Sequence, residues 1–386
     1  MNKKKFAYFV LIILIVVIVL FATLIAVLVS KNGEVEPVES RSGSGAEPSP
    51  GTSDPEGGNP WITSRTDGQD TEPAVTCSEI TTVSPGTVPV PTETEKPDDP
   101  VIPDKPEYPD AITVSTASVL SSFSTRSPYV ALYNATSDTL IYSTDLERKI
   151  YPASTTKVLT SMYALTLCEP DEVITVGNEV YMIAPDSSKA GLKVDEKFTL
   201  EQLLMAMLMK SGNDAAYVVA NHCGKKLAED QTISDFKAIS VFLDGMNEYA
   251  RSIGMLNTHY TTPDGYHSDY HYTTLYDLLV MTKVAVSNTV ITNITSQYKV
   301  SFKNVTGQKY EFTNTNQLLD STTSYYTKNI IGFKTGFTSK AGNCLISAVK
   351  ANGKVIIALC YGADKAVDRF VDAHNMLTYG LEFKEA

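Results

Sequence analysis

The feature that most constrains this chain is a run of 24 consecutive residues without a charge, residues 6–29. A helix needs about 20 apolar residues to cross a bilayer, whereas the apolar region of a cleaved signal peptide has only about 7 to 15. Lys3, Lys4 and Lys5 precede the run, and an acidic segment follows it. By the positive-inside rule the N-terminus then lies in the cytoplasm. We expect residues 1–30 to be a basic tip and single-pass membrane anchor, with the rest of the chain outside the cell.

Residues 31–112 have the composition of a disordered stalk. Fourteen of the 19 prolines lie between Pro37 and Pro109, among serine, threonine, glycine and glutamate. Such a segment buries too little apolar surface to offset the entropy lost on ordering. Residues 31–110 carry 17 acidic and 5 basic side chains, whereas residues 111–386 carry 27 and 24. The acidity of the chain therefore belongs to the stalk, and no basic patch indicates nucleic acid as a partner.

Residues 113–386 are predicted to form one mixed α/β domain, with helices around an antiparallel sheet. Two β-rich runs lie within 129–143, and capping patterns stand at Thr199-x-x-Gln202 and Thr274-x-x-Asp277. A helix break is expected at Ser211–Asn213, a two-residue turn at Asn352-Gly353 and a last amphipathic helix at 365–381. The order indicates an N-terminal hairpin, a helical cluster and C-terminal strands.

One short stretch, "PASTTK" at 152–157, places a serine three residues before a lysine. Residues three apart on a helix are neighbours, so Ser154 and Lys157 would share one face. A lone S-x-x-K is more often a helix cap than a catalytic pair. Two further motifs change the interpretation: Ser211-Gly212-Asn213 at the helix break and Lys334-Thr335-Gly336 on a predicted strand. In this order they match the S-x-x-K, S-x-N and K-T-G set of penicillin-recognising serine enzymes.

With these motifs and flanks such as "LLMAMLMKSGNDAA" and "IGFKTGFTSKAGNCLISAV", the sequence resembles the serine-type D-Ala-D-Ala carboxypeptidases among the low-molecular-mass penicillin-binding proteins. The resemblance covers about residues 113–382. It implies a beta-lactamase/transpeptidase-like fold, with a five-stranded antiparallel sheet, a helical lobe and the active site between them. It also implies a hydrolase that removes the terminal D-Ala from peptidoglycan stem pentapeptides, trims cell-wall cross-linking and is acylated by beta-lactams.

The resemblance assigns the acyl-transfer roles to the first two motifs. Ser154 would be the nucleophile and Lys157 its general base, made neutral by burial and by the charge of Lys334. Ser211 would relay a proton to the departing D-Ala. Asn213 would bind the substrate amide and steady Lys157.

The K-T-G motif is expected to bind the substrate. Lys334 and Thr335 would hold its terminal carboxylate, and Gly336 would let its backbone lie against the strand edge. Phe337 would supply an oxyanion-hole N–H together with Ser154. Many relatives have histidine where this chain has Phe337, which leaves its effect on substrate preference and deacylation open. Arg369 is either a second carboxylate anchor or a solvated helix residue.

No metal or cofactor is expected. His259, His267 and His271 crowd one loop, but their spacing matches no standard zinc motif. The five cysteines leave at least one without an intramolecular partner. Cys344 and Cys360 lie on the two arms of one predicted hairpin, and we expect buried thiols there rather than a disulfide.

Three alternatives to the carboxypeptidase remain. A beta-lactamase would need a glutamate in E-x-x-L-N, but the only Leu-Asn, Leu256-Asn257, has Ile253 in the glutamate's place. A D,D-endopeptidase would share the three motifs. A non-catalytic wall-binding or beta-lactam-sensing protein would keep the cleft for recognition alone. Release of D-Ala from a stem pentapeptide separates this last class from the enzymes.

Overall fold

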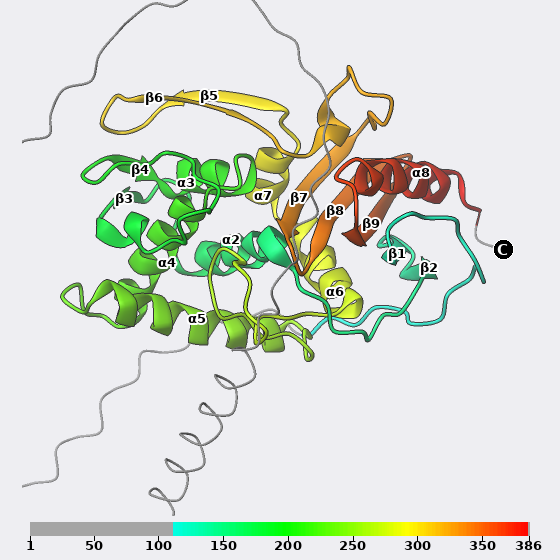
Figure 1. Ribbon diagram of the computed structural model, residues 1–386, viewed down its shortest axis with the longest axis horizontal. Helices are drawn as coiled ribbons and strands as arrows, with labels where there is room; N and C mark the ends of the chain where they lie inside the picture. The colour runs from blue at the N-terminus through cyan, green and yellow to red at the C-terminus, as the bar shows by residue number, and fades with distance from the viewer. Residues whose placement is uncertain (1–110, 385–386) are drawn as a thin grey trace, which may run out of the picture. The chain divides into compact units, whose positions relative to one another are not determined.

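The structure, a computed structural model, describes residues 111–384 (Figure 1). The predicted membrane anchor and nearly all of the predicted stalk fall outside the described residues. The strands are β1 Tyr129–Asn134, β2 Thr139–Ser143, β3 Val173–Thr175, β4 Lys197–Thr199, β5 Lys299–Lys303, β6 Lys309–Thr313, β7 Ile330–Thr338, β8 Gly342–Ala351 and β9 Lys354–Ala363. The α-helices are α2 Thr156–Leu167, α3 Leu200–Leu208, α4 Asn213–Leu227, α5 Asp235–Ser252, α6 Leu275–Ala285, α7 Thr289–Thr295 and α8 Asp368–Glu382. Short 3₁₀ turns are η1 Ala153–Thr155, η2 Asn178–Tyr181 and η3 Gln317–Leu319.

The main sheet has five strands in the order β2-β1-β9-β8-β7, and all of its neighbouring pairs are antiparallel. This confirms the mixed α/β fold and the sheet that the resemblance implied. Strand β7 carries the K-T-G motif and pairs with β8 alone, so it forms one edge of the sheet. An edge strand keeps one row of backbone hydrogen-bonding groups unpaired, which an extended peptide can use.

Helices cover both faces of this sheet (Figure 1). On one face, α8 packs Phe370, Met376 and Leu377 against the strands in a separate apolar cluster. On the other face a larger cluster joins the sheet to α2 and α6 and continues into the helical lobe. That lobe consists of α3, α4 and α5 with the small β3–β4 sheet (Figure 1). Helix α2 is therefore buried between the lobe and the sheet.

Local signals in the sequence explain where the elements begin and end. Thr199 and Gln202 form the expected capping box at the start of α3. The Thr274 side chain accepts a hydrogen bond from the Asp277 N–H and caps α6 as predicted. The β8–β9 turn is the predicted two-residue one, because Asn352 and Gly353 have φ values of 53° and 73°. The final helix, α8, lies within two or three residues of its predicted range.

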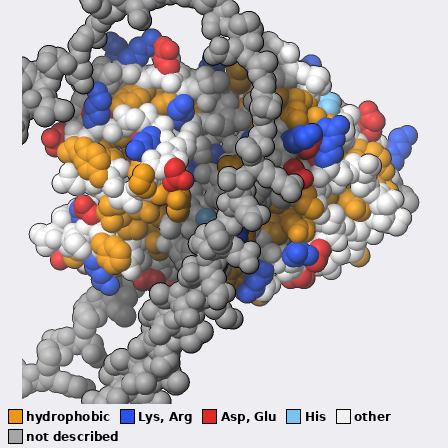
Figure 2. Space-filling view, in the orientation of Figure 1, with side chains coloured by type: hydrophobic (Ala, Val, Ile, Leu, Met, Phe, Trp, Pro, Cys, Tyr) orange, Lys and Arg blue, Asp and Glu red, His pale blue; other side chains and the backbone are white. Residues whose placement is uncertain are grey.

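The surface of the described residues has mixed charge. On the face shown in Figure 2, basic and acidic side chains lie among hydrophobic ones. Within residues 111–384, no single helix has both the length and the apolar composition needed to cross a membrane; the consecutive pair α6 and α7, bent by 102°, has them only when taken together.

Candidate active site

The predicted nucleophile, Ser154, lies on a strained turn at the start of α2. The preceding residue, Ala153, has φ 49°, a left-handed conformation that is costly for a residue with a side chain. Two glycines let other segments approach this turn closely. A Cβ at Gly265 would lie 1.9 Å from the Ala153 carbonyl oxygen, and a Cβ at Gly336 would lie 3.1 Å from the Ser154 nitrogen. Any other side chain at Gly265 would clash, so the turn is held between this loop and strand β7.

The predicted base, Lys157, is completely buried one turn further along. Its Nζ lies 2.8 Å from Ser154 Oγ, 2.8 Å from Asn213 Oδ1 and 2.7 Å from the Asp264 carbonyl oxygen. The structure thus brings together the S-x-x-K pair and the asparagine of the second motif. Three partners also suit a neutral amine, which can donate to the two carbonyl-type oxygens and accept the serine proton on its lone pair.

Burial lowers the pKa of Lys157 to about 8, while the charges of Asp264 and Asp214 act in the opposite direction. Burial and the Lys157 ammonium both lower the pKa of Lys334. Because repulsion between two ammonium groups is mutual, this agrees with the expected effect of Lys334 on Lys157. With a pKa of about 8, roughly a tenth of Lys157 is neutral at pH 7 and able to accept a proton, which a general base requires.

The third motif reaches the same cluster from the edge strand. Lys334 Nζ donates to Ser211 Oγ at 2.9 Å and to the Thr335 carbonyl at 2.8 Å. Ser211 itself has φ 63°, so it is a second left-handed residue in the site. Thr335 Oγ1 lies 2.6 Å from Thr315 Oγ1. Lys157 therefore contacts Ser154, and Lys334 contacts Ser211. Asn213, from the same motif as Ser211, connects the second motif to the first through its contact with Lys157.

A pocket of about 450 Å³ opens beside these residues. Ser154, Asn213 and Phe337 line it together with loop residues around Ser187 and Tyr266. The Phe337 side chain is 62% exposed at its rim. A pocket of this volume, with the Ser154 hydroxyl in its wall and an edge strand alongside, is suited to a peptide-sized substrate.

Arg369, on α8, reaches strand β7 from the face of the sheet that α8 covers. Its Nη1 donates to the Gly336 carbonyl at 2.7 Å and to the Cys344 carbonyl at 3.2 Å. Burial lowers the pKa of its guanidinium. Arg369 is therefore a partly buried support of the K-T-G strand and not a solvated helix residue, and its contact with a substrate carboxylate stays a prediction.

Sequence reasoning missed Asp214, the residue after the S-x-N motif. Its carboxylate accepts hydrogen bonds from the backbone N–H groups of Ala190, Gly191 and Leu192, at 2.9, 2.8 and 3.2 Å. These residues follow the loop that lines the pocket. An acidic residue in the first turn of a helix was the available signal, but its partners lie more than 20 positions away in the sequence.

The histidines of the 259–271 loop have separate partners. His271 is buried, accepts from the Thr261 N–H at Nδ1, 3.0 Å, and faces Thr156 Oγ1 with Nε2 at 2.8 Å. Its pKa is lowered to about 3, chiefly by burial. His259 instead contacts the Tyr270 carbonyl through Nδ1 at 2.8 Å. Through its contact with Thr156, the first residue of α2, His271 positions the helix that carries Lys157. The cysteines Cys344 and Cys360 are buried free thiols, as predicted.

A serine hydroxyl in contact with a buried lysine, next to an open strand edge, is the arrangement typical of serine acyl-transfer enzymes with the penicillin-recognising fold. The family model for D-alanyl-D-alanine carboxypeptidases, peptidase S11, matches residues 115–365. The chain belongs to this family.

Individual relatives agree with that assignment. D-alanyl-D-alanine carboxypeptidase DacF of Bacillus subtilis is 25% identical over 63% of this chain and 59% of its own length. The D-alanyl-D-alanine carboxypeptidase of Streptomyces sp. K15 is 30% identical over 65% of this chain and 85% of that protein. The crystal structure of the Streptomyces K15 DD-transpeptidase has a TM-score of 0.62 at 26% identity, covering 68% of this chain and 100% of that one. The chain spans only 59% and 62% of the first two curated relatives, DacF and the Haemophilus influenzae DacA.

Proposed function

We propose that this protein is a serine D-Ala-D-Ala carboxypeptidase that removes the terminal D-Ala from peptidoglycan stem pentapeptides and is acylated by beta-lactams. The observation that carries the proposal is the 2.8 Å contact between Lys157 Nζ and Ser154 Oγ, in a side-chain cluster that also contains the Lys334–Ser211 contact. A protein that only binds the cell wall would not require a buried lysine with a lowered pKa against a serine. A solved relative, penicillin-binding protein D2 of Listeria monocytogenes, is described in a cefotaxime-bound form.

In the acylation step, neutral Lys157 takes the proton of Ser154 as Oγ attacks the carbonyl carbon of the penultimate D-Ala. The backbone N–H groups of Ser154 and Phe337 would stabilise the oxyanion. The C–N bond then breaks as the proton held by Lys157 passes through Ser211 to the nitrogen of the departing D-Ala, which leaves Lys157 neutral again. Water attacks the resulting ester and gives a proton to Lys157, which returns it to Ser154 Oγ as the ester bond breaks and the shortened peptide leaves.

The second half of the site would select the substrate. Lys334 and Thr335 are placed on the edge strand where a terminal carboxylate would lie if the peptide extended along β7. The substrate carboxylate would also stabilise the ammonium form of Lys334, since an opposite charge raises a lysine pKa. Selection of a free C-terminus would favour carboxypeptidase over endopeptidase action.

We further propose that residues 1–30 anchor the enzyme in the cell membrane with its N-terminus in the cytoplasm. Residues 31–112 would then hold the catalytic domain outside, within reach of the cell wall. The support for this is the uncharged run with its preceding lysines and the proline-rich composition that follows. Protease added to intact cells is expected to release an active fragment of about 30 kDa, taking roughly 110 Da per residue.

The proposal is tested by penicillin labelling and by D-Ala release with the same purified chain. A peptide map should place a single penicillin adduct on Ser154, and a stem pentapeptide should release D-Ala. Ser154→Ala should abolish both, whereas Ser161→Ala, about two turns further along the same helix, should keep both. An adduct without D-Ala release would support the sensing protein instead. Transfer to an added amino-acid acceptor in place of water would indicate a transpeptidase.

A further inference from the structure

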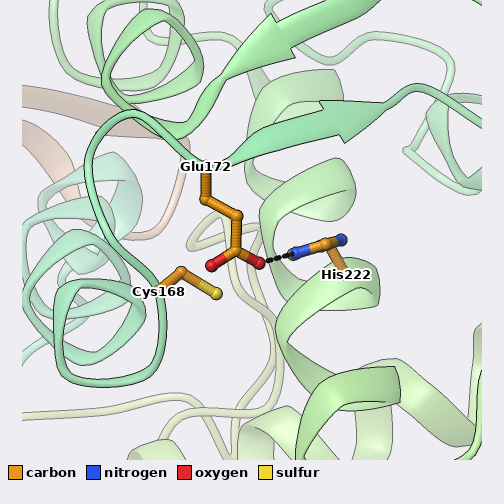
Figure 3. A group of neighbouring side chains, drawn as sticks. All are labelled: Cys168, Glu172 and His222. Carbon is orange, nitrogen blue, oxygen red and sulfur yellow. Dashed lines mark hydrogen bonds and ion pairs between the residues drawn. The ribbon is translucent and has the colours of Figure 1, made fainter.

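Side chains that can bind metals converge at the other end of the helices that carry the active site. Cys168 follows the last residue of α2, Glu172 precedes β3, and His222 lies in α4, and Figure 3 shows the three pointing toward one another. Their ligand atoms all lie within 4.8 Å of one another. His222 Nε2 is 2.7 Å from Glu172 Oε1. We call Cys168, Glu172 and His222 the distal cluster.

We propose that the distal cluster binds one zinc ion. A thiolate, an imidazole and a carboxylate are the three ligand types that zinc takes in proteins, and water would take the fourth position of the tetrahedron. Magnesium and calcium prefer oxygen ligands, so the sulfur and nitrogen donors favour zinc. This inference does not depend on the proposed peptidase activity.

The geometry is close to what zinc requires. Ligand distances of about 2.0 to 2.3 Å in a tetrahedron separate the donor atoms by about 3.3 to 3.8 Å. The 2.7 Å contact between Glu172 and His222 must therefore open by less than about 1 Å, and the wider separations, up to 4.8 Å, must close by about as much. The side chains of Glu172 and His222 are 27% and 25% exposed, so an ion can reach them from solvent.

Two neighbours are placed to support the ligands. Cys223 Sγ lies 3.7 Å from Cys168 Sγ, and Lys226 Nζ lies 3.6 Å from the same sulfur and 2.7 Å from Glu172 Oε2. Both can donate hydrogen bonds to ligand atoms while Glu172 Oε1 turns to the metal. Outer hydrogen bonds of this kind orient metal ligands. At 3.7 Å the two sulfurs are far from the roughly 2.05 Å of a disulfide bond.

A zinc ion here would link the end of α2 to the second half of α4. Helix α2 has 12 residues and is about 18 Å long, so the ion would lie well away from Ser154. Its role would be structural, holding together the two helices whose first residues carry the catalytic groups. Loss of zinc should therefore lower the thermal midpoint by about 5 to 10 °C.

The experiment measures metal binding by the full-length chain, purified under reducing conditions and loaded with zinc sulfate. After desalting we expect about one zinc per chain by elemental analysis. Cobalt titration should give the visible bands of a tetrahedral site and a thiolate-to-cobalt charge-transfer band. The cobalt spectrum of the unaltered chain tests the proposal even if a variant misfolds.

Variants then locate the site. Glu172→Gln and His222→Gln should each weaken zinc binding by at least about tenfold, whereas Cys344→Ser, a buried thiol in the sheet, should leave it unchanged. Less than about 0.2 zinc per chain, or cobalt bands without thiolate charge transfer, would overturn the proposal. So would a Cys168–Cys223 disulfide in the chain purified without reductant, because the thiolate ligand would then be absent.

Discussion

Helices α2 and α4 carry polar clusters at both ends, and the two clusters are built differently. At the active-site end, Lys157 is completely buried and contacts three oxygens. Two residues there, Ala153 and Ser211, hold left-handed backbone conformations. At the distal end, Glu172 and His222 stay about a quarter exposed.

The difference shows two ways of keeping reactive side chains in a folded domain. Buried lysines and strained residues must be stabilised by the surrounding structure, and such strain is typical of catalytic sites. The distal cluster balances its charges through the Glu172 contacts with His222 and Lys226, which suits a structural role. Substitutions at the active-site end should therefore mainly lower the reaction rate, whereas substitutions at the distal end should mainly lower the stability of the fold.

The largest expected effect tests the chemistry of the active-site end. Lys157→Arg keeps the charge but removes a group that can lose its proton near neutral pH. Penicillin acylation, followed by mass spectrometry, should fall by about 10² to 10⁴-fold. Lys157→Met, neutral and smaller than arginine, should give the same loss and separate chemistry from crowding. The exposed Lys210→Arg is the control, and near-normal acylation by Lys157→Arg would assign the base elsewhere.

The next effect concerns pH. If Lys157 is the base, its neutral amine is the active form, and burial lowers the pKa of this amine to about 8. The acylation rate should therefore rise about tenfold per pH unit below 8 and level off above it, a gain of about 50-fold between pH 6 and 8. Stopped reactions with a fluorescent penicillin at fixed ionic strength would measure it. A rate constant independent of pH from 6 to 9 would contradict the assignment of the base.

What the sequence could predict follows from the range of each interaction. Ser154 and Lys157 were found because residues three apart on a helix are neighbours, and the capping pattern at Thr199 is equally local. The contact between Ser211 and Lys334 joins residues 123 positions apart. Only the resemblance to a family, and no spacing rule, placed these two together.

The missed features depend on tertiary packing. The left-handed Ala153 is held by the close approach of Gly265, and no local propensity favours that conformation for alanine. The sulfurs of Cys168 and Cys223 meet because the end of α2 lies beside α4, 55 positions later. The cysteine count could suggest an unpaired thiol but not this neighbour.

A smaller effect would decide the role of Arg369. Amidating the terminal D-Ala removes the substrate carboxylate, and turnover should drop by at least about tenfold, since a charged hydrogen bond contributes about 1.5 to 3 kcal/mol. If Arg369 contacts that carboxylate, Arg369→Gln should slow the free acid more than the amide. If it only supports β7 through the Gly336 carbonyl, both substrates should slow equally. Equal turnover of acid and amide by the unaltered enzyme would instead contradict the carboxylate pocket.

The smallest effect concerns Asp214, whose hydrogen bonds hold the backbone beside the pocket loop and so act as a structural clamp at the active-site end. Asp214→Asn weakens the charge-assisted hydrogen bonds to the backbone N–H groups at 190–192. The free energy of unfolding should fall by about 1 to 3 kcal/mol, measured by urea denaturation. Asp235→Asn, which removes a partly exposed ion pair with Lys225, is the matched control and should lower the free energy of unfolding by less than about 1 kcal/mol.

The same variant makes a second prediction that a purely structural role would not. The charge of Asp214 raises the pKa of Lys157, so its removal should move the midpoint of the acylation profile to lower pH. Asn at this position still accepts some of the loop's hydrogen bonds, so the pocket persists and the profile can be measured. A midpoint that stays in place while stability falls would make Asp214 a clamp alone. A midpoint that moves down would show that the residue anchoring the pocket loop also sets the protonation of the base.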